Sequence, residues 1–232
     1  MRKVIPMCRR LALFALVALV SVTANAQEKW KEGEQYFVIE PAQDVWMPAE
    51  GKITVTEVFS YGCPACNYFF PMAERLKDSL PDNAQLNYLP ASFIPRESWP
   101  MFQRAWCTAV VLGVFSDATH KATFDAVWKS GKLATTEADG RRLKNPQPTI
   151  EDAAKFYAGV ADVSEDKFLK TAGSFTTDSM MRKADNLVKA YRVSSTPTIV
   201  VAGKYRLTVQ SAGGVDELIE LVNYLVAKEA GM

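Results

Sequence analysis

Two cysteines separated by two residues, Cys63 and Cys66, stand where a strand-type segment meets a helix-type segment. Residues 52–60 (KITVTEVFS) are rich in β-branched and aromatic side chains, which predicts a strand that runs directly into the cysteines. After the cysteines, apolar residues recur at helical spacing between charged ones: Phe69, Met72, Ala73, Leu76 and Leu80. The pair is therefore expected at the first turn of a helix that directly follows a strand, and this restricts the chain to folds that combine both elements.

The position at a helix N-terminus determines the chemistry expected of the pair. Pro64 suits the first turn, because the amide at that position has no partner within the helix. The sulfur of Cys63 would face unsatisfied backbone N–H groups and the positive end of the helix dipole, which lowers its pKa below the ~8.5 of a free cysteine. Cys66 would lie one turn further in, within disulfide reach but less exposed. An accessible attacking sulfur beside a sheltered resolving sulfur is what thiol–disulfide exchange requires.

The rest of the chain predicts two halves of one sheet around a helical block. Every strong signal from about residue 97 to residue 193 is helical, and Thr149 and Ser164 are candidate N-caps within it. Further strands are expected at 35–40, 85–90, 198–201 and 205–209, and helices at 99–115, 122–128, 179–191 and 215–226. The order is βαβ, then helices, then ββα, which indicates a helical domain inserted into an α/β domain. We expect the α/β domain to comprise residues 27–95 and 193–232, and the insertion residues 96–192.

The first 26 residues have the pattern of a secretory signal peptide. Basic residues precede an apolar run over residues 11–22, and Ala24-Asn25-Ala26 forms a small-x-small cleavage signal. The apolar run is 12 residues long, whereas a membrane-spanning helix needs ~18 or more. We therefore expect export to the periplasm, cleavage after Ala26 and no stable membrane insertion of the mature chain.

Charge and cysteine content restrict the function classes. Removing the four basic residues of the signal peptide changes the formal net charge from +1 to −3 and leaves no basic block, so nothing points to nucleic acid. Three cysteines remain after cleavage: Cys63, Cys66 and Cys107. An exported protein stapled by disulfides would normally have an even and larger number, so the composition favours working thiols.

Thr196-Pro197 precedes the returning strand and is a candidate cis peptide bond at the edge of the sheet. Proline carries no N–H that would compete for the sulfur. The backbone of Thr196 would stay free to pair with an extended peptide, as in strand addition.

These features together resemble the DsbA family of periplasmic thiol:disulfide interchange proteins, which have a thioredoxin fold interrupted by an inserted all-helical domain. The resemblance rests on EVFSYGCPAC, the helical insertion, TPTIVVAGKY and the signal peptide, and it extends over essentially the whole mature chain. It implies that Cys63 is the nucleophile, Cys66 the resolving cysteine and Pro197 the cis-proline, while Glu57 matches a buried acid that exchanges protons with the inner cysteine.

The resemblance also implies partners. The substrates would be unfolded or newly exported proteins that contain cysteines, bound at Thr196, Pro64 and Ala65. Reoxidation would come from a DsbB-like membrane oxidase linked to quinone, and no cofactor is implied.

Two residues depart from the most studied family members. These carry histidine at the position of Ala65, where the imidazole helps to stabilise the thiolate, so we expect a less depressed Cys63 pKa here. Threonine before the cis-proline, as at Thr196, is familiar in related isomerases and reductases, and this leaves the direction of electron flow open.

Other readings of the same residues remain open at this point. The protein could be a disulfide isomerase or reductase of the same fold, against which no separate dimerisation domain is evident before the first strand. It could also be a non-catalytic peptide- or metal-binding module. A structural disulfide would close only a small loop, and a zinc site would need Cys107 and His120 as further ligands. Glu57 could be a solvent-facing residue on an edge strand.

Three further expectations concern residues outside the motif. Cys107 is expected to be a buried free thiol that packs as a small hydrophobic residue. His120 is expected at the surface or at an interface. Tyr61, Phe69 and Phe70 could line an apolar groove for substrate, although Phe69 fits the helix core better.

Overall fold

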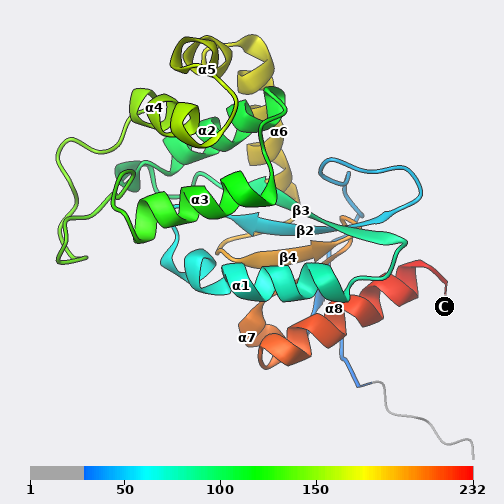
Figure 1. Cartoon of the computed structure of the whole chain (residues 1–232). Helices are drawn as coiled ribbons and strands as arrows, with labels where there is room; N and C mark the ends of the chain where they lie inside the picture. The colour runs from blue at the N-terminus through cyan, green and yellow to red at the C-terminus, as the bar shows by residue number, and fades with distance from the viewer. Residues whose placement is uncertain (1–28, 232) are drawn as a thin grey trace, which may run out of the picture.

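The computed structural model describes residues 29–231, so the expected signal peptide lies outside the described residues. Five strands form one mixed sheet in the order β1-β5-β4-β2-β3 (Figure 1). β2 and β3 pair in parallel, whereas β4 pairs antiparallel with both β2 and β5, and β1 pairs antiparallel with β5. The strands are β1 (Phe37–Val38), β2 (Ile53–Phe59), β3 (Ala84–Pro90), β4 (Thr198–Val201) and β5 (Tyr205–Leu207).

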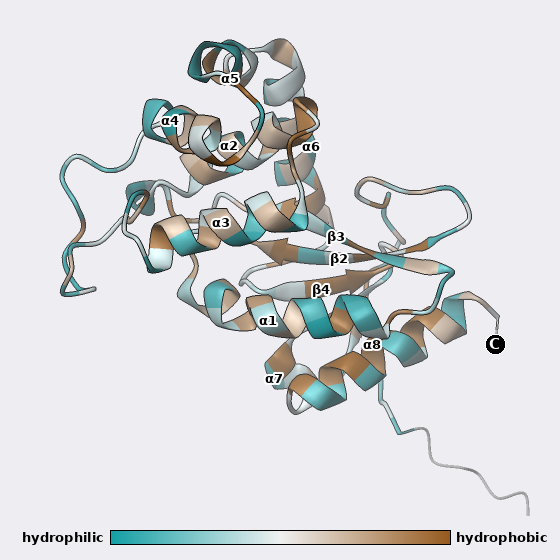
Figure 2. Cartoon of the chain, in the orientation of Figure 1, coloured by the Kyte–Doolittle hydropathy of each residue, from teal (hydrophilic) through white to brown (hydrophobic). Residues whose placement is uncertain are grey.

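The central position of β2 follows from its side chains. Six of its seven residues are buried, and β3 and β4 flank it on either side. A strand enclosed on both sides and both faces needs a nearly continuous run of apolar and β-branched residues. Figure 2 shows the resulting hydrophobic colouring of the inner strands.

Helices cover the sheet on both sides (Figure 1). α1 (Pro64–Ser79) and α8 (Val215–Glu229) lie together on one side, where Arg75 and Asp216 form an ion pair at 2.7 Å. The short helix α7 (Val209–Ala212) leads into α8. The inserted block lies on the other side and consists of α2 (Trp99–Val111), α3 (Asp117–Trp128), α4 (Ile150–Val160), α5 (Glu165–Ala172) and α6 (Phe175–Ala190), preceded by a short 3-10 turn (Pro95–Glu97).

Three apolar clusters hold these layers together. The first lies between α1, α8 and one face of the sheet, with Val55, Ile199, Leu76 and Leu225 among its members. The second lies between the sheet and the inserted helices and is rich in aromatic rings, including Phe59, Trp46 and Trp106. The third lies within the block, between α2, α4 and α5. The alternation of Ile199 and Val200 between the first two clusters is the period-two pattern of a strand buried on both faces.

Capping residues set the helix boundaries. Thr149 and Ser164 cap α4 and α5 through bonds to the amides of Asp152 and Lys167, as expected. The helix expected at 179–191 begins earlier, at Phe175, because Ser174 caps it. The strand expected at 205–209 ends at Leu207, because Thr208 forms a capping box with Ser211 and starts α7.

The chain between α3 and α4 departs from the helical prediction. Residues 129–149 contain no helix, and an isolated bridge pairs Thr136 with Leu143. Among residues 29–231, the structure has no helix that is both long and apolar enough to cross a membrane.

Truncation of Leu225 to alanine should destabilise the α/β half. Its side chain is fully buried between α8 and the sheet, so Leu225→Ala removes apolar contact and leaves a cavity that costs about 2–5 kcal/mol of unfolding free energy. Urea unfolding followed by circular dichroism measures this. The control Val160→Ala, at a half-exposed site of α4, should change the free energy by less than about 0.5 kcal/mol; equal losses in both variants would contradict the assigned core.

Candidate functional site

Cys63 is the N-cap residue of α1. Its backbone is extended, with φ −87° and ψ 117°, and its sulfur accepts a hydrogen bond from the amide of Cys66 at 3.4 Å. Pro64 occupies the first helical position, where its missing N–H costs nothing. Both cysteines are free thiols in this structure. Cys63 is 6% exposed and Cys66 0%, so the first sulfur reaches the surface and the second lies beneath it.

The two thiols have opposite pKa shifts. The pKa of Cys63 falls from 9.0 to about 6, first because of the hydrogen bond with the Cys66 side chain and then because of Thr196 and the amides of Cys66 and Ala65, while burial opposes the shift. The pKa of Cys66 is raised well above 9.0, chiefly by burial and also by its hydrogen bond to Cys63 and the nearby charge of Glu57. Near neutral pH the pair therefore has one thiolate and one thiol.

The loop before β4 lies against this sulfur. The Thr196–Pro197 bond is cis, as expected. The carbonyl oxygen of Thr196 lies 3.5 Å from Sγ of Cys63, within reach of an S–H hydrogen bond. A carbonyl accepts only from the protonated sulfur, so this backbone contact favours the thiol, whereas the Cys66 thiol, the Thr196 side chain and the amides of Cys66 and Ala65 favour the thiolate and outweigh it. The fold thus brings together residues 133 positions apart in the sequence.

Glu57 is buried beneath the cysteines, at 3% exposure on the central strand β2. The reading of Glu57 as a solvent-facing residue on an edge strand is therefore wrong. Its register partners are Tyr88 on β3 and Ile199 on β4. Burial raises its pKa from 4.5 to about 8, and the charges of Cys63 and Glu74 add to the increase. The carboxyl group is therefore largely protonated at neutral pH.

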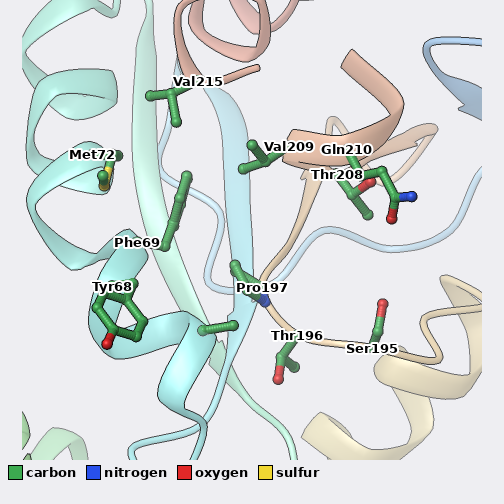
Figure 3. Close-up of a pocket in the computed structure, with 11 residues that line it drawn as sticks. Tyr68, Phe69, Met72, Ser195, Thr196, Pro197, Thr208, Val209, Gln210 and Val215 are labelled. Atoms are coloured by element: carbon green, nitrogen blue, oxygen red, sulfur yellow. The ribbon is translucent and has the colours of Figure 1, made fainter. Parts of the chain in front are cut away.

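An apolar groove of about 480 Å³ opens beside the cysteine pair. Figure 3 shows side chains of α1, including Tyr68 and Met72, facing Thr196 and Pro197 across it. The start of α7 and the first residue of α8 complete the wall. The lining residues are Ala65, Tyr68, Phe69, Met72, Ser195, Thr196, Pro197, Thr208, Val209, Gln210 and Val215.

The residues that line this groove differ in part from those predicted from the sequence. Phe69 lines it while also packing in the core, but Tyr61 is buried and Phe70 packs against the aromatic cluster on the other side. Tyr68, which is 76% exposed, was not predicted from the sequence. The available signal was its position on α1, because it lies off the helix face that carries the buried residues Cys66, Phe69, Ala73 and Leu76.

The predictions for Cys107 and His120 differ in their outcome. Cys107 is a fully buried free thiol, as expected, and burial raises its pKa to about 12. The prediction of a surface position for His120 is wrong: it is 1% exposed, and its Nδ1 lies 2.7 Å from the hydroxyl of Tyr61. Because that nitrogen already has a partner within an aromatic cluster, His120 does not supply the ligand that the zinc alternative required. Residues 29–231 contain no group of three or more His, Cys, Asp or Glu suited to hold a metal ion.

A cysteine pair at a helix N-terminus, next to a cis-proline on a mixed sheet with an inserted helical block, defines a thioredoxin-fold dithiol protein. The family described as Thioredoxin matches residues 48–221. The thiol:disulfide interchange protein DsbA of Pseudomonas aeruginosa is 36% identical over 218 residues, which cover 94% of either chain. DsbA of Azotobacter vinelandii is 35% identical and covers 95% of this chain and 98% of its own.

Solved structures agree with these relatives. The crystal structure of P. aeruginosa DsbA aligns with a TM-score of 0.73 at 35% identity, covering 88% of this chain and 97% of that one. DsbA from Xylella fastidiosa aligns with a TM-score of 0.73 at 29% identity, covering 86% and 97%. The chain belongs to the DsbA family of thiol:disulfide interchange proteins and is a thiol–disulfide oxidoreductase. The expected thioredoxin fold with a helical insertion is confirmed.

Replacement of Glu57 by glutamine should change the pH dependence of stability. Between pH 4.5 and about 8 the native protein holds a proton on Glu57 that the unfolded chain has released, so this group's contribution to stability is lost as the pH rises through that window. Glu57→Gln cannot lose a proton, so it should gain stability relative to the reduced wild type as the pH rises from 5 to about 8.

Urea unfolding of both reduced proteins across this range provides the measurement. The exposed residue Glu50 offers a matched control, and Glu50→Gln should give a stability difference that does not vary with pH in this way. Parallel curves for Glu57→Gln and the wild type would show that Glu57 does not have the raised pKa.

Proposed function

We propose that the Cys63–Cys66 pair carries the exchange reaction, with Cys63 as the nucleophile and Cys66 as the resolving cysteine. In the oxidised enzyme, a substrate thiolate attacks Sγ of Cys63, the Cys63–Cys66 bond breaks, and Cys66 leaves as a thiolate that takes up a proton. A second substrate thiolate then attacks the substrate sulfur of the mixed disulfide. The substrate disulfide forms, Cys63 leaves as a thiolate, and the enzyme has gained two electrons from the substrate.

The opposite pKa shifts of the two sulfurs support this assignment most directly. A leaving group of low pKa departs faster, so the depressed pKa of Cys63 favours release of the oxidised substrate. The raised pKa of Cys66 keeps it protonated once it has been displaced, which lowers its tendency to attack the mixed disulfide again.

Glu57 is proposed as the proton donor to Cys66. Its carboxyl group is buried, holds a proton at neutral pH, and interacts electrostatically with the Cys66 sulfur. A buried thiolate without a proton source would be costly to form, because its charge cannot be solvated. Proton transfer from Glu57 would remove that cost when the internal disulfide opens.

Substrate binding is proposed along the groove beside Pro197. The backbone of Thr196 would pair with an extended segment of an unfolded, cysteine-containing protein, while Pro64 and Ala65 contact it from the helix side. Strand pairing uses hydrogen bonds of the substrate's main chain, and the groove is largely apolar. Binding should therefore depend little on the substrate's amino-acid sequence. Tyr68 adds an exposed aromatic surface at the groove mouth.

The cellular setting is proposed from the family and the first 26 residues of the sequence. The enzyme would work in the periplasm after removal of the signal peptide, on newly exported proteins. A DsbB-like membrane oxidase linked to quinone would restore its disulfide. We further propose that residues 96–192 form the insertion domain, bounded on both sides by the two parts of the thioredoxin-like domain, 27–95 and 193–232.

A reductase or isomerase of the same fold is the second candidate. Ala65 and Thr196 favour it, because Ala65 has no side-chain donor for the thiolate and Thr196 is typical of those enzymes. An oxidase should be mainly oxidised in cells and an isomerase mainly reduced. Trapping the thiols with an alkylating reagent at the moment of lysis and resolving the two forms by mass separates these roles.

Serine at position 66 should trap the mixed disulfide. In Cys66→Ser, Cys63 can join to a substrate cysteine but no internal thiol can release it. Non-reducing electrophoresis of the variant after incubation with an unfolded protein that carries a disulfide should show a covalent complex, because the Cys63 thiolate attacks that disulfide, joins to one of its sulfurs and releases the other as a thiolate. Cys63→Ser should show none and should lose oxidase activity, whereas Cys107→Ala, at a buried thiol away from the pair, should react as the wild type does. A complex that persists in Cys63→Ser would refute the assignment of the nucleophile.

Histidine at position 65 should strengthen the oxidant. Ala65→His adds a donor near the Cys63 sulfur and should move the Cys63 pKa below about 6. The reduced protein is then favoured, and the equilibrium with glutathione shifts toward reduction of the Cys63–Cys66 disulfide. Ultraviolet absorbance of the thiolate against pH gives the pKa, and Ala65→Ser is a smaller-donor comparison. An unchanged pKa in Ala65→His would show that the helix N-terminus alone sets the thiolate's stability.

A further inference from the structure

The segment that joins β2 to α1, residues 60–62, is held by a helix of the insertion. The hydroxyl of Tyr61 and Nδ1 of His120 on α3 share a hydrogen bond of 2.7 Å. On the same helix, Nε1 of Trp128 donates to the backbone carbonyl of Tyr61 at 2.8 Å. Tyr61 is thus bound at both its side chain and its backbone, two residues before Cys63.

The surroundings of His120 make the side-chain bond strong. His120 and Tyr61 are each 1% exposed. The rings packed against His120 belong to Phe59, Tyr61, Phe70, Tyr88, Phe115 and Phe124. Burial among these rings lowers the pKa of His120 to about 3, with the charge of Lys77 as a second cause, so the imidazole is neutral. In such a place a hydroxyl or ring nitrogen left without its partner costs about 1–3 kcal/mol.

The segment is also confined from the side of α2. A methyl group at Gly62 would lie 2.7 Å from Nε1 of Trp99 and 3.3 Å from the ring of Phe102. The backbone of Gly62 therefore touches α2 directly, while α3 holds Tyr61. Two helices of the insertion fix the path of the chain as it enters the redox motif.

The sulfur of Cys63 depends on this path because both of its hydrogen-bond contacts require the sulfur to stay at the end of α1. It lies 3.4 Å from the Cys66 amide and 3.5 Å from the Thr196 carbonyl oxygen. The amide of Cys63 bonds to the Ser60 carbonyl at 3.1 Å, so the position of the cap follows that of residues 60–62. A displacement of these residues by less than 1 Å would lengthen the sulfur–amide contact and weaken the stabilisation of the thiolate.

We propose that Tyr61, His120 and Trp128 are positioning residues, through which α3 of the inserted block holds Cys63 at the N-terminus of α1 and so sets its reactivity. The proposal rests on the role of Cys63 as nucleophile. The inserted block would then influence the reactivity of Cys63. Its helix α3 lies beside α1 in Figure 1, and an ion pair between Lys77 and Asp117 joins the two helices at their surface.

The test compares three variants of the Tyr61–His120 pair in the reduced protein. His120→Phe keeps an aromatic ring in the cluster but removes the imidazole nitrogen that shares a hydrogen bond with Tyr61. His120→Asn restores a polar atom near the position of Nδ1. Tyr61→Phe removes the hydroxyl from the other side. For each, thiolate absorbance against pH gives the Cys63 pKa, and equilibration with glutathione gives the constant for reduction of the disulfide.

His120→Phe and Tyr61→Phe should both raise the Cys63 pKa and make the disulfide about 3- to 10-fold less oxidising, which corresponds to a pKa increase of roughly half to one. His120→Asn should lie close to the wild type. The double variant His120→Phe with Tyr61→Phe removes both partners of this hydrogen bond, so it should regain stability in urea unfolding relative to the single variants while keeping the altered pKa. That combination separates positioning from a contribution to stability alone.

An unchanged Cys63 pKa and glutathione equilibrium in folded His120→Phe and Tyr61→Phe would overturn the proposal. If His120→Phe does not fold, Trp128→Phe decides: it keeps a ring at a half-buried site and removes only the donor to the Tyr61 carbonyl. It should shift the pKa in the same direction, and no shift would overturn the proposal. Trapping by Cys66→Ser stays the separate test of Cys63 itself, so the two ideas can fail independently.

Discussion

The hydrogen bond from the Cys66 amide to the sulfur of Cys63 is the contact on which the site depends. It makes a cysteine serve as a helix cap, a role that serine and threonine fill elsewhere in this chain. Aspartate and asparagine share this role with them in proteins generally. A cap that accepts from backbone N–H groups is better as an anion, so folding of α1 and ionisation of the sulfur support each other. Formation of a disulfide at Cys63 replaces this charge, and the helix then loses its charged cap. The reduced form is thereby favoured over the disulfide.

The sheet order explains how the site is assembled from distant parts of the chain. β2 delivers Cys63, and β4, its antiparallel neighbour, begins directly after Pro197. The ends of β2 and β4 that carry these residues therefore meet at one edge. The inserted helices lie between β3 and β4 in the sequence, yet both strands pair with β2 in one sheet, and the helices pack against one side of that sheet (Figure 1).

Much of the fold and of the site could be predicted from the sequence, because the local sequence signals are strong. The cysteine pair after a β-branched run, the caps at Thr149 and Ser164, and the strand at 198–201 each depend on neighbouring residues alone. The predicted element boundaries were wrong where a second local signal overrode the first, as when Thr208 started a helix within an expected strand.

The prediction for His120 was wrong for a different reason. A histidine among polar neighbours reads as a surface residue, and only the tertiary fold reveals the six rings around it and its bond to Tyr61. Tyr68 was missed because the groove that it lines is formed by several segments that are distant in the sequence, and only the fold brings them together.

The burial of Cys107 has a consequence for fidelity. A thiol–disulfide oxidoreductase meets disulfides at every turnover, and a third accessible thiol would form an unwanted mixed disulfide with them. Cys107 sits inside the insertion at zero exposure, and its sulfur stays protonated, so it is neither reachable nor nucleophilic. The packing of the inserted block thus leaves Cys63 as the only cysteine among residues 29–231 with a side chain that reaches the surface.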